Sequence, residues 1–308
     1  MHRAPLVYTG ISQLAWFKRP DFDGLRVFIS MNSLDKYRGD LPDPRGTIAA
    51  IDSGGFTELK NYGTWRTTAE EYAAKCHKVR QVFGRQVEWF SPQDWMCEPV
   101  VLAGGKTKDG VFKGTGLSVE EHQRRTVENF LALRRLVPTV IPVIQGWTVF
   151  DYWRCLEMYA DHKIDLRQFP CVGVGSVCRR QSTNEATLIL RSIATETGEN
   201  LHGFGFKADG IVNCASELRS ADTFAWSFAG RKRPDTTHEH YQRSSRFVPE
   251  NFNKRGCADD CSQCPEYCLA WRRKLLREID ARLSTQKSQT SFFYGDHRWS
   301  TDSLRMPA

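Results

Sequence analysis

Short apolar segments rich in β-branched residues alternate along this chain with stretches of helical periodicity. A strand of a parallel sheet reads as such a segment, and a helix repeats its apolar positions every three or four residues. The pattern predicts strands in GLRVFISM (24–31), TIAAID (47–52), QVEWFSP (86–92), TVIPVIQG (139–146), PCVGVGSV (170–177), LHGFGF (201–206) and DTFAWSF (222–228), and helices at 67–84, 118–137, 148–162 and 182–198. The position of the first strand is not fixed by this pattern.

Strands that alternate with helices predict parallel strands joined by crossover connections. Seven or eight such repeats in 308 residues favour a closed (β/α)8 TIM barrel over an open sheet. Ser118 followed by Glu121 forms a capping box at one helix start, and Gly198 is placed to end another helix. We therefore expect an α/β barrel with a small C-terminal zinc-binding helical appendage.

The composition sets the broad class of protein. Hydrophobic content of 40% is typical of a packed globular protein, no apolar run reaches membrane-spanning length, and the N-terminus lacks a secretory signal. We expect a cytoplasmic protein without membrane contact. The net charge of +7 includes clusters at His122–Arg124–Arg125, Arg179–Arg180 and Arg231–Arg233. Each is consistent with a solvated helix face, and three clusters on one rim would suit a polyanion.

Polar and glycine residues collect where the predicted strands end. Barrel enzymes build their sites at the carboxyl ends of the strands. In chain order these ends carry Asp52, Ser53, Gly54 and Gly55; Asp94; Gln145 and Gly146; Gly173, Gly175 and Ser176; Gly205; and Asp222. Acids, an amide and bare backbone at several strand ends predict a pocket for a flat polar ligand.

Three motifs carry a family resemblance. DSGGF, VIQG and VGVGS are similar to those of the tRNA-guanine transglycosylase superfamily, whose members exchange guanine for a 7-deazaguanine. The resemblance covers roughly residues 45–270. The compact chain and its SPQDWM and DTFAW segments look most like the DpdA-type transglycosylases of phages and bacterial modification islands, which act on DNA.

The resemblance implies a role for each residue of the motifs. Asp222 would be the nucleophile that attacks C1′, and Asp52 the acid and base that serves the leaving and entering bases. Asp94 and Gln145 would bind the base edge, with Ser53, Gly54, Gly55, Gly146, Gly173, Gly175, Ser176 and Gly205 in the binding site. Phe56 or Phe204 would stack on the base. In another register Ala225 would take the place of the nucleophile, which would remove the reaction.

Each of these residues also has a purely structural interpretation. Asp52 can satisfy a turn, and Asp94 or Asp222 can cap a helix. Gln145 can bond to backbone groups at a strand end, and both phenylalanines can belong to the core.

Four cysteines lie within twelve residues near the C-terminus. Cys257, Cys261, Cys264 and Cys268 have the spacing C-x3-C-x2-C-x3-C, which suits structural Zn²⁺ in a reducing compartment. The first three match the radical SAM spacing, but the motif follows the barrel and Gln263 replaces the usual aromatic. We expect a catalytic barrel at 1–245, a four-cysteine zinc subdomain with a basic helix (269–283) at 246–285, and a tail at 286–308.

The expected function is therefore guanine exchange in DNA by a pentosyltransferase, with a preQ0-like 7-deazaguanine as second substrate. The partners to consider are DNA in preference to tRNA, and a homodimer or accessory modification proteins. The alternatives are the same exchange on tRNA, of the queuosine or archaeosine type, a radical SAM enzyme, and a non-catalytic zinc protein that binds nucleic acid.

Overall fold

Eight strands form one parallel sheet in the computed structural model, which describes residues 3–11, 13–178, 180, 183–231 and 261–295. The strand order is β4-β3-β2-β1-β10-β9-β8-β7. These strands are β1 (Leu6–Gly10), β2 (Arg26–Ser30), β3 (Ile48–Asp52), β4 (Val87–Phe90), β7 (Val143–Ile144), β8 (Val172–Val174), β9 (Leu201–Gly203) and β10 (Ser220–Thr223). A separate antiparallel hairpin pairs β5 (Gly105–Thr107) with β6 (Gly110–Phe112).

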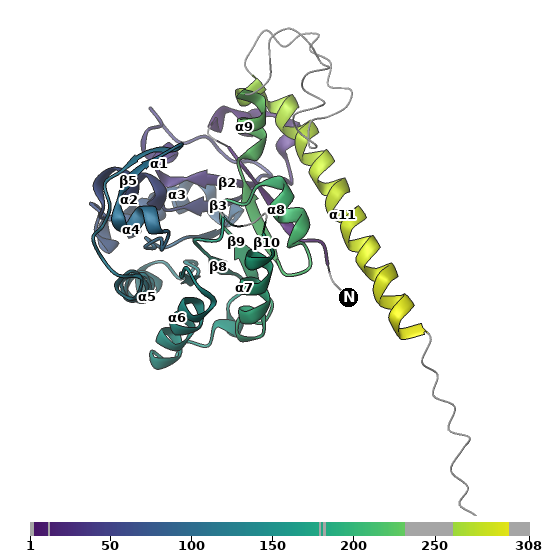
Figure 1. Cartoon of the computed structure of the whole chain (residues 1–308). Helices are drawn as coiled ribbons and strands as arrows, with labels where there is room; N and C mark the ends of the chain where they lie inside the picture. Colours follow the sequence, from purple (N-terminus) through teal and green to yellow (C-terminus); the bar gives the residue numbers. More distant parts are fainter. Residues whose placement is uncertain (1–2, 12, 179, 181–182, 232–260, 296–308) are drawn as a thin grey trace, which may run out of the picture.

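The sheet, whose labelled strands β2, β3, β8, β9 and β10 lie in the middle of Figure 1, is curled so that the end of β4 meets the segment before β7. Phe90 at the end of β4 forms a parallel bridge with Val140, three residues before β7 begins. The Phe90 N–H donates to the carbonyl of Thr139 at 3.1 Å, and the Ile141 N–H donates to the carbonyl of Phe90 at 3.0 Å. The predicted α/β fold with parallel strands is confirmed, while the pairing between the outer strands is limited to this bridge.

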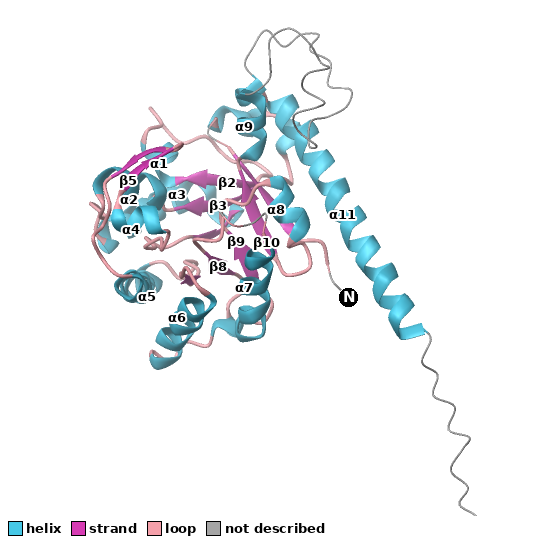
Figure 2. Cartoon of the chain, in the orientation of Figure 1, coloured by secondary structure: helices cyan, strands magenta, loops and turns pink. Residues whose placement is uncertain are grey.

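Helices surround the curled sheet (Figure 2). Thr68 and Thr148 begin two of them with complete capping boxes, and Ser118 accepts from the Glu121 N–H at the start of a third. The four helices expected from periodicity are α3, α5, α6 and α7. The bounds are α1 (Met31–Asp35), α2 (Gly55–Tyr62), α3 (Ala69–Phe83), α4 (Pro99–Ala103), α5 (Val119–Leu136), α6 (Val149–Asp161), α7 (Asn184–Ala194), α8 (Ala208–Asn213), α9 (Ala225–Arg231) and α11 (Pro265–Gly295).

The segment DTFAWSF is not a strand throughout, contrary to the sequence prediction. Strand β10 ends at Thr223, and α9 begins at Ala225. Thr223 Oγ1 accepts from the Ala225 N–H at 3.2 Å, which favours the turn into the helix. The Trp226 indole is buried and donates to the carbonyl of Gly10 at 2.8 Å. The apolar run therefore reflects a buried helix packed against β1, the strand whose place the pattern left open.

The long helix α11 runs along one side of the molecule, next to α8 and α9 (Figure 1). It contains the expected basic helix 269–283. The predicted boundary at 245/246 lies outside the described residues. No helix in the described part of the chain combines the length and apolar character needed to cross a bilayer.

Candidate active site

Three aspartates occupy the carboxyl-end side of the sheet. Asp52 is the last residue of β3, Asp222 lies in β10, and Asp94 follows β4 by four residues. Strands β2 and β1 separate β3 from β10 in the sheet order. Burial raises the pKa of both Asp52 and Asp94, and the charge of Asp222 on Asp52, and of Asp52 on Asp94, adds to these shifts. The curl of the sheet thus brings acids that are far apart in the chain within electrostatic reach of each other.

Asp52 is held at the entrance to α2. Burial, followed by the charge of Asp222, raises its pKa to about 6, and hydrogen bonds from Gly54, Ser30 and Ser53 partly oppose this shift. The Gly54 N–H donates to Asp52 Oδ2 at 2.9 Å. Gly54 has φ = 88°, and a Cβ there would lie 2.3 Å from Asn32 Nδ2. A glycine is therefore required for this backbone group to face the carboxylate.

Asp94 belongs to a chain of polar contacts. Gln145, which directly follows β7, donates from Nε2 to Asp94 Oδ2 at 2.5 Å. The Ser176 hydroxyl lies 2.7 Å from Gln145 Oε1 and accepts from the Cys97 N–H at 2.7 Å. Burial and the charge of Asp52 raise the pKa of Asp94 to about 7. Three loops, after β4, β7 and β8, are thereby joined around one carboxyl group.

Glu98 extends this chain and was not identified from the sequence. Its side chain is buried, and Oε2 lies 3.0 Å from the Ser176 hydroxyl. Ser176 itself has φ = 58°, an uncommon conformation for a residue with a side chain. The sequence offered one signal, since Glu98 follows the SPQDWMC segment by one residue.

Asp222 has two partners in the described structure. The sequence predicted Gly205 as part of the site but did not identify His202. The Gly205 N–H, just after β9, donates to Asp222 Oδ1 at 2.9 Å. His202 Nε2 lies 3.3 Å from the same oxygen, and His202 Nδ1 lies 2.8 Å from Ser220 Oγ. His202 is fully buried, and its ring meets those of Trp89 and Phe204 at centroid distances of 4.8 and 4.9 Å. A histidine in a short apolar strand was the signal that could have revealed this residue.

The glycines of the predicted site mostly serve close packing. A Cβ on Gly175 would lie 2.1 Å from Gln145 Nε2, and one on Gly173 would lie 2.3 Å from the Phe204 ring. A Cβ on Gly146 would lie 2.8 Å from the backbone nitrogen of Tyr152. These three glycines therefore make room for neighbouring protein atoms. The space beside their Cα atoms is already filled.

The remaining predicted residues lie in different surroundings. Phe204 belongs to the aromatic cluster around His202. Phe56, on α2, is 45% exposed and meets Phe112 of the hairpin at 5.7 Å. Gly55 starts α2 near Trp65. Ser53 is buried, and its hydroxyl has no hydrogen-bond partner in the described part of the chain.

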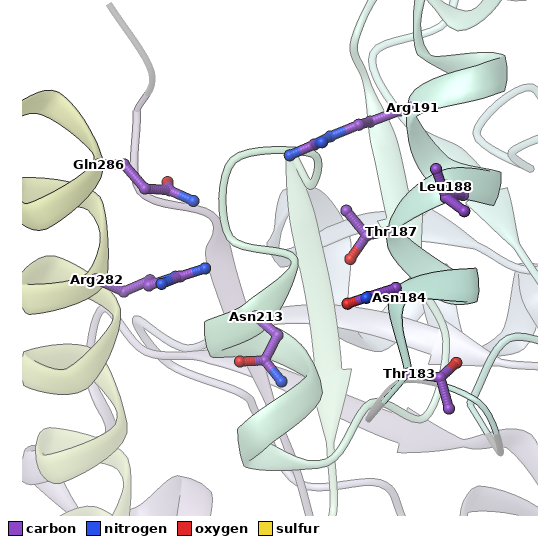
Figure 3. Close-up of a pocket in the computed structure, with 8 residues that line it drawn as sticks. All are labelled: Thr183, Asn184, Thr187, Leu188, Arg191, Asn213, Arg282 and Gln286. Carbon is purple, nitrogen blue, oxygen red and sulfur yellow. The ribbon is translucent and has the colours of Figure 1, made fainter. Parts of the chain in front are cut away.

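A pocket of about 500 Å³ lies away from these acids, between α7, α8 and α11. Figure 3 shows Arg282 and Gln286 of α11 facing Thr187 and Arg191 of α7 across it. None of the predicted site residues lines this pocket.

The basic clusters are largely neutralised. Arg124 lies within 2.6 Å of both Glu121 and Glu128, and Arg125 lies 2.6 Å from Glu121. Arg180 is buried and lies 2.6 Å from Glu185. His122 is fully buried; its Nδ1 and Nε2 lie 2.7 Å from the Met96 carbonyl and Thr115 hydroxyl, and burial lowers its pKa. Arg179, Lys232 and Arg233 lie outside the described residues.

Three of the four clustered cysteines are described, and Cys257 lies outside the described residues. Cys261 begins the 3-10 turn η6 (Cys261–Gln263), while Cys264 and Cys268 lie just before and within the first turn of α11; all three are buried. The described residues contain no group of three His, Cys, Asp or Glu side chains arranged to hold a metal ion. Cysteine thiolates are suitable ligands for zinc, but one of the four cysteines, Cys257, is not among the described residues.

The sequence also matches a known family across nearly its whole length. Residues 4–301 match the family described as DpdA, DeoxyPurine in DNA protein A. The chain belongs to the DpdA family. A comparison with curated proteins gave no match. For the DpdA family the description refers to a deoxypurine in DNA, so the acids described above lie in a protein associated with base modification of DNA.

Proposed function

We propose that this chain is a base-exchange transglycosylase, a pentosyltransferase that replaces guanine in DNA with a 7-deazaguanine base of the preQ0 type. The observation that carries the proposal is the placement of Asp52 and Asp222 toward the carboxyl ends of two strands of one curled parallel sheet, in a chain of the DpdA family. We further infer that the sheet acts as a (β/α)8 barrel closed at the Phe90–Val140 bridge. The carboxyl ends of its strands then surround one cavity.

In the first half of the reaction, Asp222 attacks C1′ of the target deoxyguanosine. The C1′–N9 bond breaks, its electron pair goes to the guanine, and the Asp52 carboxyl supplies the proton that neutralises the departing base. The contacts from Gly205 and His202 orient the Asp222 carboxylate. The raised pKa of Asp52, about 6, supports this role, because a group near neutrality can both give and take a proton.

In the second half, the 7-deazaguanine replaces guanine. Asp52 takes the proton from N9, the N9 electron pair attacks C1′, and the ester bond to Asp222 breaks. Each half displaces at the same carbon, so the sugar retains its configuration, as in a retaining glycosidase.

Asp94 and Gln145 would recognise the base. A guanine edge offers N1–H and N2–H donors, which an Asp94 carboxylate can accept, and an O6 acceptor for an amide N–H. The Gln145–Ser176 contacts support this assignment because they fix Asp94 from a neighbouring loop. The buried, unpaired Ser53 hydroxyl supports a polar ligand beside Asp52, since such a group favours a partner by about 1–3 kcal/mol.

The test is base exchange followed by trapping of the intermediate. The protein is incubated with radiolabelled guanine and either duplex DNA or tRNA, and the covalent DNA adduct is digested to locate the modified residue. We expect label in DNA and an ester on Asp222. Label in tRNA alone would overturn the choice of DNA, and an adduct on any other residue would overturn the assigned nucleophile.

We propose one structural Zn²⁺ held by Cys257, Cys261, Cys264 and Cys268. The three described cysteines lie on a segment that packs closely on α9, since Ser227 donates to the Ser262 carbonyl at 2.9 Å and a Cβ on Gly230 would lie 2.6 Å from Cys261. Zinc there would hold this segment, and hence α11, against the helix that follows β10. About one zinc and no iron per chain in protein prepared without oxygen would support this; an iron–sulfur cluster would favour the radical SAM alternative.

A further inference from the structure

The β5–β6 hairpin lies in the same connection as Asp94. From the end of β4 the chain runs past Asp94 and through α4, forms the hairpin, and continues into α5. In Figure 2 the hairpin lies beside α2 and α4. Because this connection starts at the carboxyl end of β4, the hairpin belongs to the same side of the sheet as the candidate active site.

The hairpin carries a concentration of exposed lysines. Lys106, Lys108 and Lys113 are exposed, and none of them forms an ion pair with a residue in the described part of the chain. The segment from Gly104 to Gly116 contains one acid, Asp109. Arg124 and Arg125 of the neighbouring helix are, by contrast, paired with glutamates. Positive charge is therefore available at the hairpin, while that of Arg124 and Arg125 is compensated.

The hairpin is also firmly attached to the loop that carries Asp94. Phe112 is 2% exposed and packs in a small cluster with Leu59, Trp95 and Val101. The Lys113 N–H donates to the Lys60 carbonyl at 2.9 Å, which joins the hairpin to α2. Trp95 is the neighbour of Asp94 in the chain. A ligand held by the hairpin is thus held at a fixed position relative to Asp94.

The exposed face combines these lysines with apolar surface. Lys106 pairs across the hairpin with Val111, which is 65% exposed, and Phe56 is exposed nearby against Phe112. Lysines spaced along a narrow ribbon suit the regularly spaced phosphates of a nucleic acid, while apolar side chains can contact its sugars. Without the lysines, an exposed apolar patch would give no reason to expect a nucleic acid as the partner.

We propose that the β5–β6 hairpin is a docking surface for the phosphate backbone of the DNA strand that flanks the exchanged nucleotide. The proposal rests on the proposed function for its choice of DNA. The hairpin positions the strand by phosphate contacts, so that an extruded base meets the loop of Asp94. Its contacts are independent of sequence and sensitive to salt.

The test compares two triple variants of the full chain by binding to fluorescent duplex DNA. The first is Lys106→Gln, Lys108→Gln and Lys113→Gln. The matched control is Lys78→Gln, Arg85→Gln and Arg135→Gln, which removes three exposed charges from the outer surface of α3, the turn before β4 and the end of α5. Affinity is measured at several salt concentrations, and base exchange is measured separately at saturating DNA.

We expect the hairpin variant to bind DNA at least about tenfold more weakly at low salt, with the slope of log K against log salt reduced by about 2.7, while the control variant binds as the unmodified chain does. The exchange rate at saturating DNA should be retained. Equal losses in the two triple variants, or no loss in the hairpin variant, would overturn the proposal without affecting the proposed function.

Two further outcomes separate the inference from the function. If the unmodified chain binds DNA through the hairpin but exchanges no base, the docking surface stands and the proposed function fails. If polyglutamate binds the hairpin with the same salt dependence and DNA does not bind, the surface belongs to an acidic protein partner and the proposal is overturned.

Discussion

His202 Nε2 lies 3.3 Å from Asp222 Oδ1, across two neighbouring strands. His202 of β9 is in register with Ser220 of β10, so its ring reaches along the partner strand to the next residue on the same face. Ser220 Oγ holds the other ring nitrogen, and aromatic rings surround the imidazole. His202 therefore has a single orientation, and it is a positioning residue for the candidate nucleophile.

We expect His202→Phe to slow formation of the covalent adduct by about ten- to a hundredfold, with little change in KM for either substrate. Phenylalanine keeps an aromatic ring in the cluster but removes the contact with the Asp222 carboxylate, so the loss should appear in the chemical step and not in binding. The measurement is single-turnover adduct formation at saturating DNA, together with KM for each substrate.

Tyr8→Phe is the control for His202, because it keeps an aromatic ring against the imidazole and keeps the backbone pairing of residue 8 with Asp222, while it removes the hydroxyl that donates to Glu88. It should leave the rate of adduct formation unchanged. A His202→Phe variant that forms the adduct at the normal rate would show that the histidine has only a packing role.

Gly54→Ala should lower both stability and base exchange. The new Cβ would meet Asn32 at 2.3 Å, and the positive φ adds about 1 kcal/mol of strain. Displacement of the Gly54 N–H would remove a donor from Asp52. Thermal unfolding and the exchange rate are the two readouts.

Gly39→Ala provides a matched control for that change. Gly39 has a similar φ of 92°, but no atom lies within 4 Å of the added Cβ. It should show the strain of about 1 kcal/mol and normal exchange. If both alanine variants exchange base at the same rate, the Gly54 N–H does not matter for Asp52.

Asp94→Asn should increase the free energy of unfolding above pH 7. Burial raises the pKa of Asp94 to about 7 in the folded chain, compared with about 3.9 for an unperturbed aspartate, so folding favours the protonated form. Protonation of Asp94 therefore stabilises the folded chain fully at pH values below the pKa of this aspartate in the unfolded chain. This stabilisation is lost as pH rises through 7. Because the side chain is only half-buried, we expect a gain of about 1–2 kcal/mol at pH 8 and none at pH 4.

Urea unfolding at the two pH values measures this effect. The same variant should lose most base exchange, because asparagine offers an N–H where the guanine edge presents donors. Equal free energies of unfolding for Asp94→Asn and the unmodified chain at pH 8 would show that burial does not disfavour the charged Asp94 carboxylate.

The proposed Zn²⁺ predicts that Cys268→Ser destabilises the C-terminal segment before the curled sheet. The change removes a thiol from the first turn of α11, the helix that packs on α9. We expect loss of bound zinc and a fall in Tm of several degrees, with exchange at low temperature largely retained. Cys214→Ser is the control, since Cys214 is buried outside this cluster and should leave the zinc content unchanged. Normal zinc content in Cys268→Ser would remove it from the ligand set.

The strand ends could be located from sequence because a strand and the turn that follows it are local features. Asp52, Gln145 and Ser176 each follow a short apolar run, so their shared side of a parallel sheet follows from the alternation of strands and helices. The helix α9 was missed for the complementary reason. A short apolar segment has the same pattern whether it is a buried strand or a buried helix, and here packing of Trp226 on β1 decides.

What the sequence alone determined was therefore the alternation of parallel strands with helices, the acids at strand ends and the family. Tertiary structure decided which groups meet: His202 with Asp222, and Ser176 with both Gln145 and Glu98. It placed Asp52 where burial raises its pKa and the charge of Asp222 adds to the rise. It also decided which charges are available, since glutamates one helical turn away neutralise Arg124 and Arg125, while the hairpin lysines form no ion pair with any residue that the structure describes. Such outcomes depend on the curl of the sheet and on side-chain placement, which no local pattern of residues encodes.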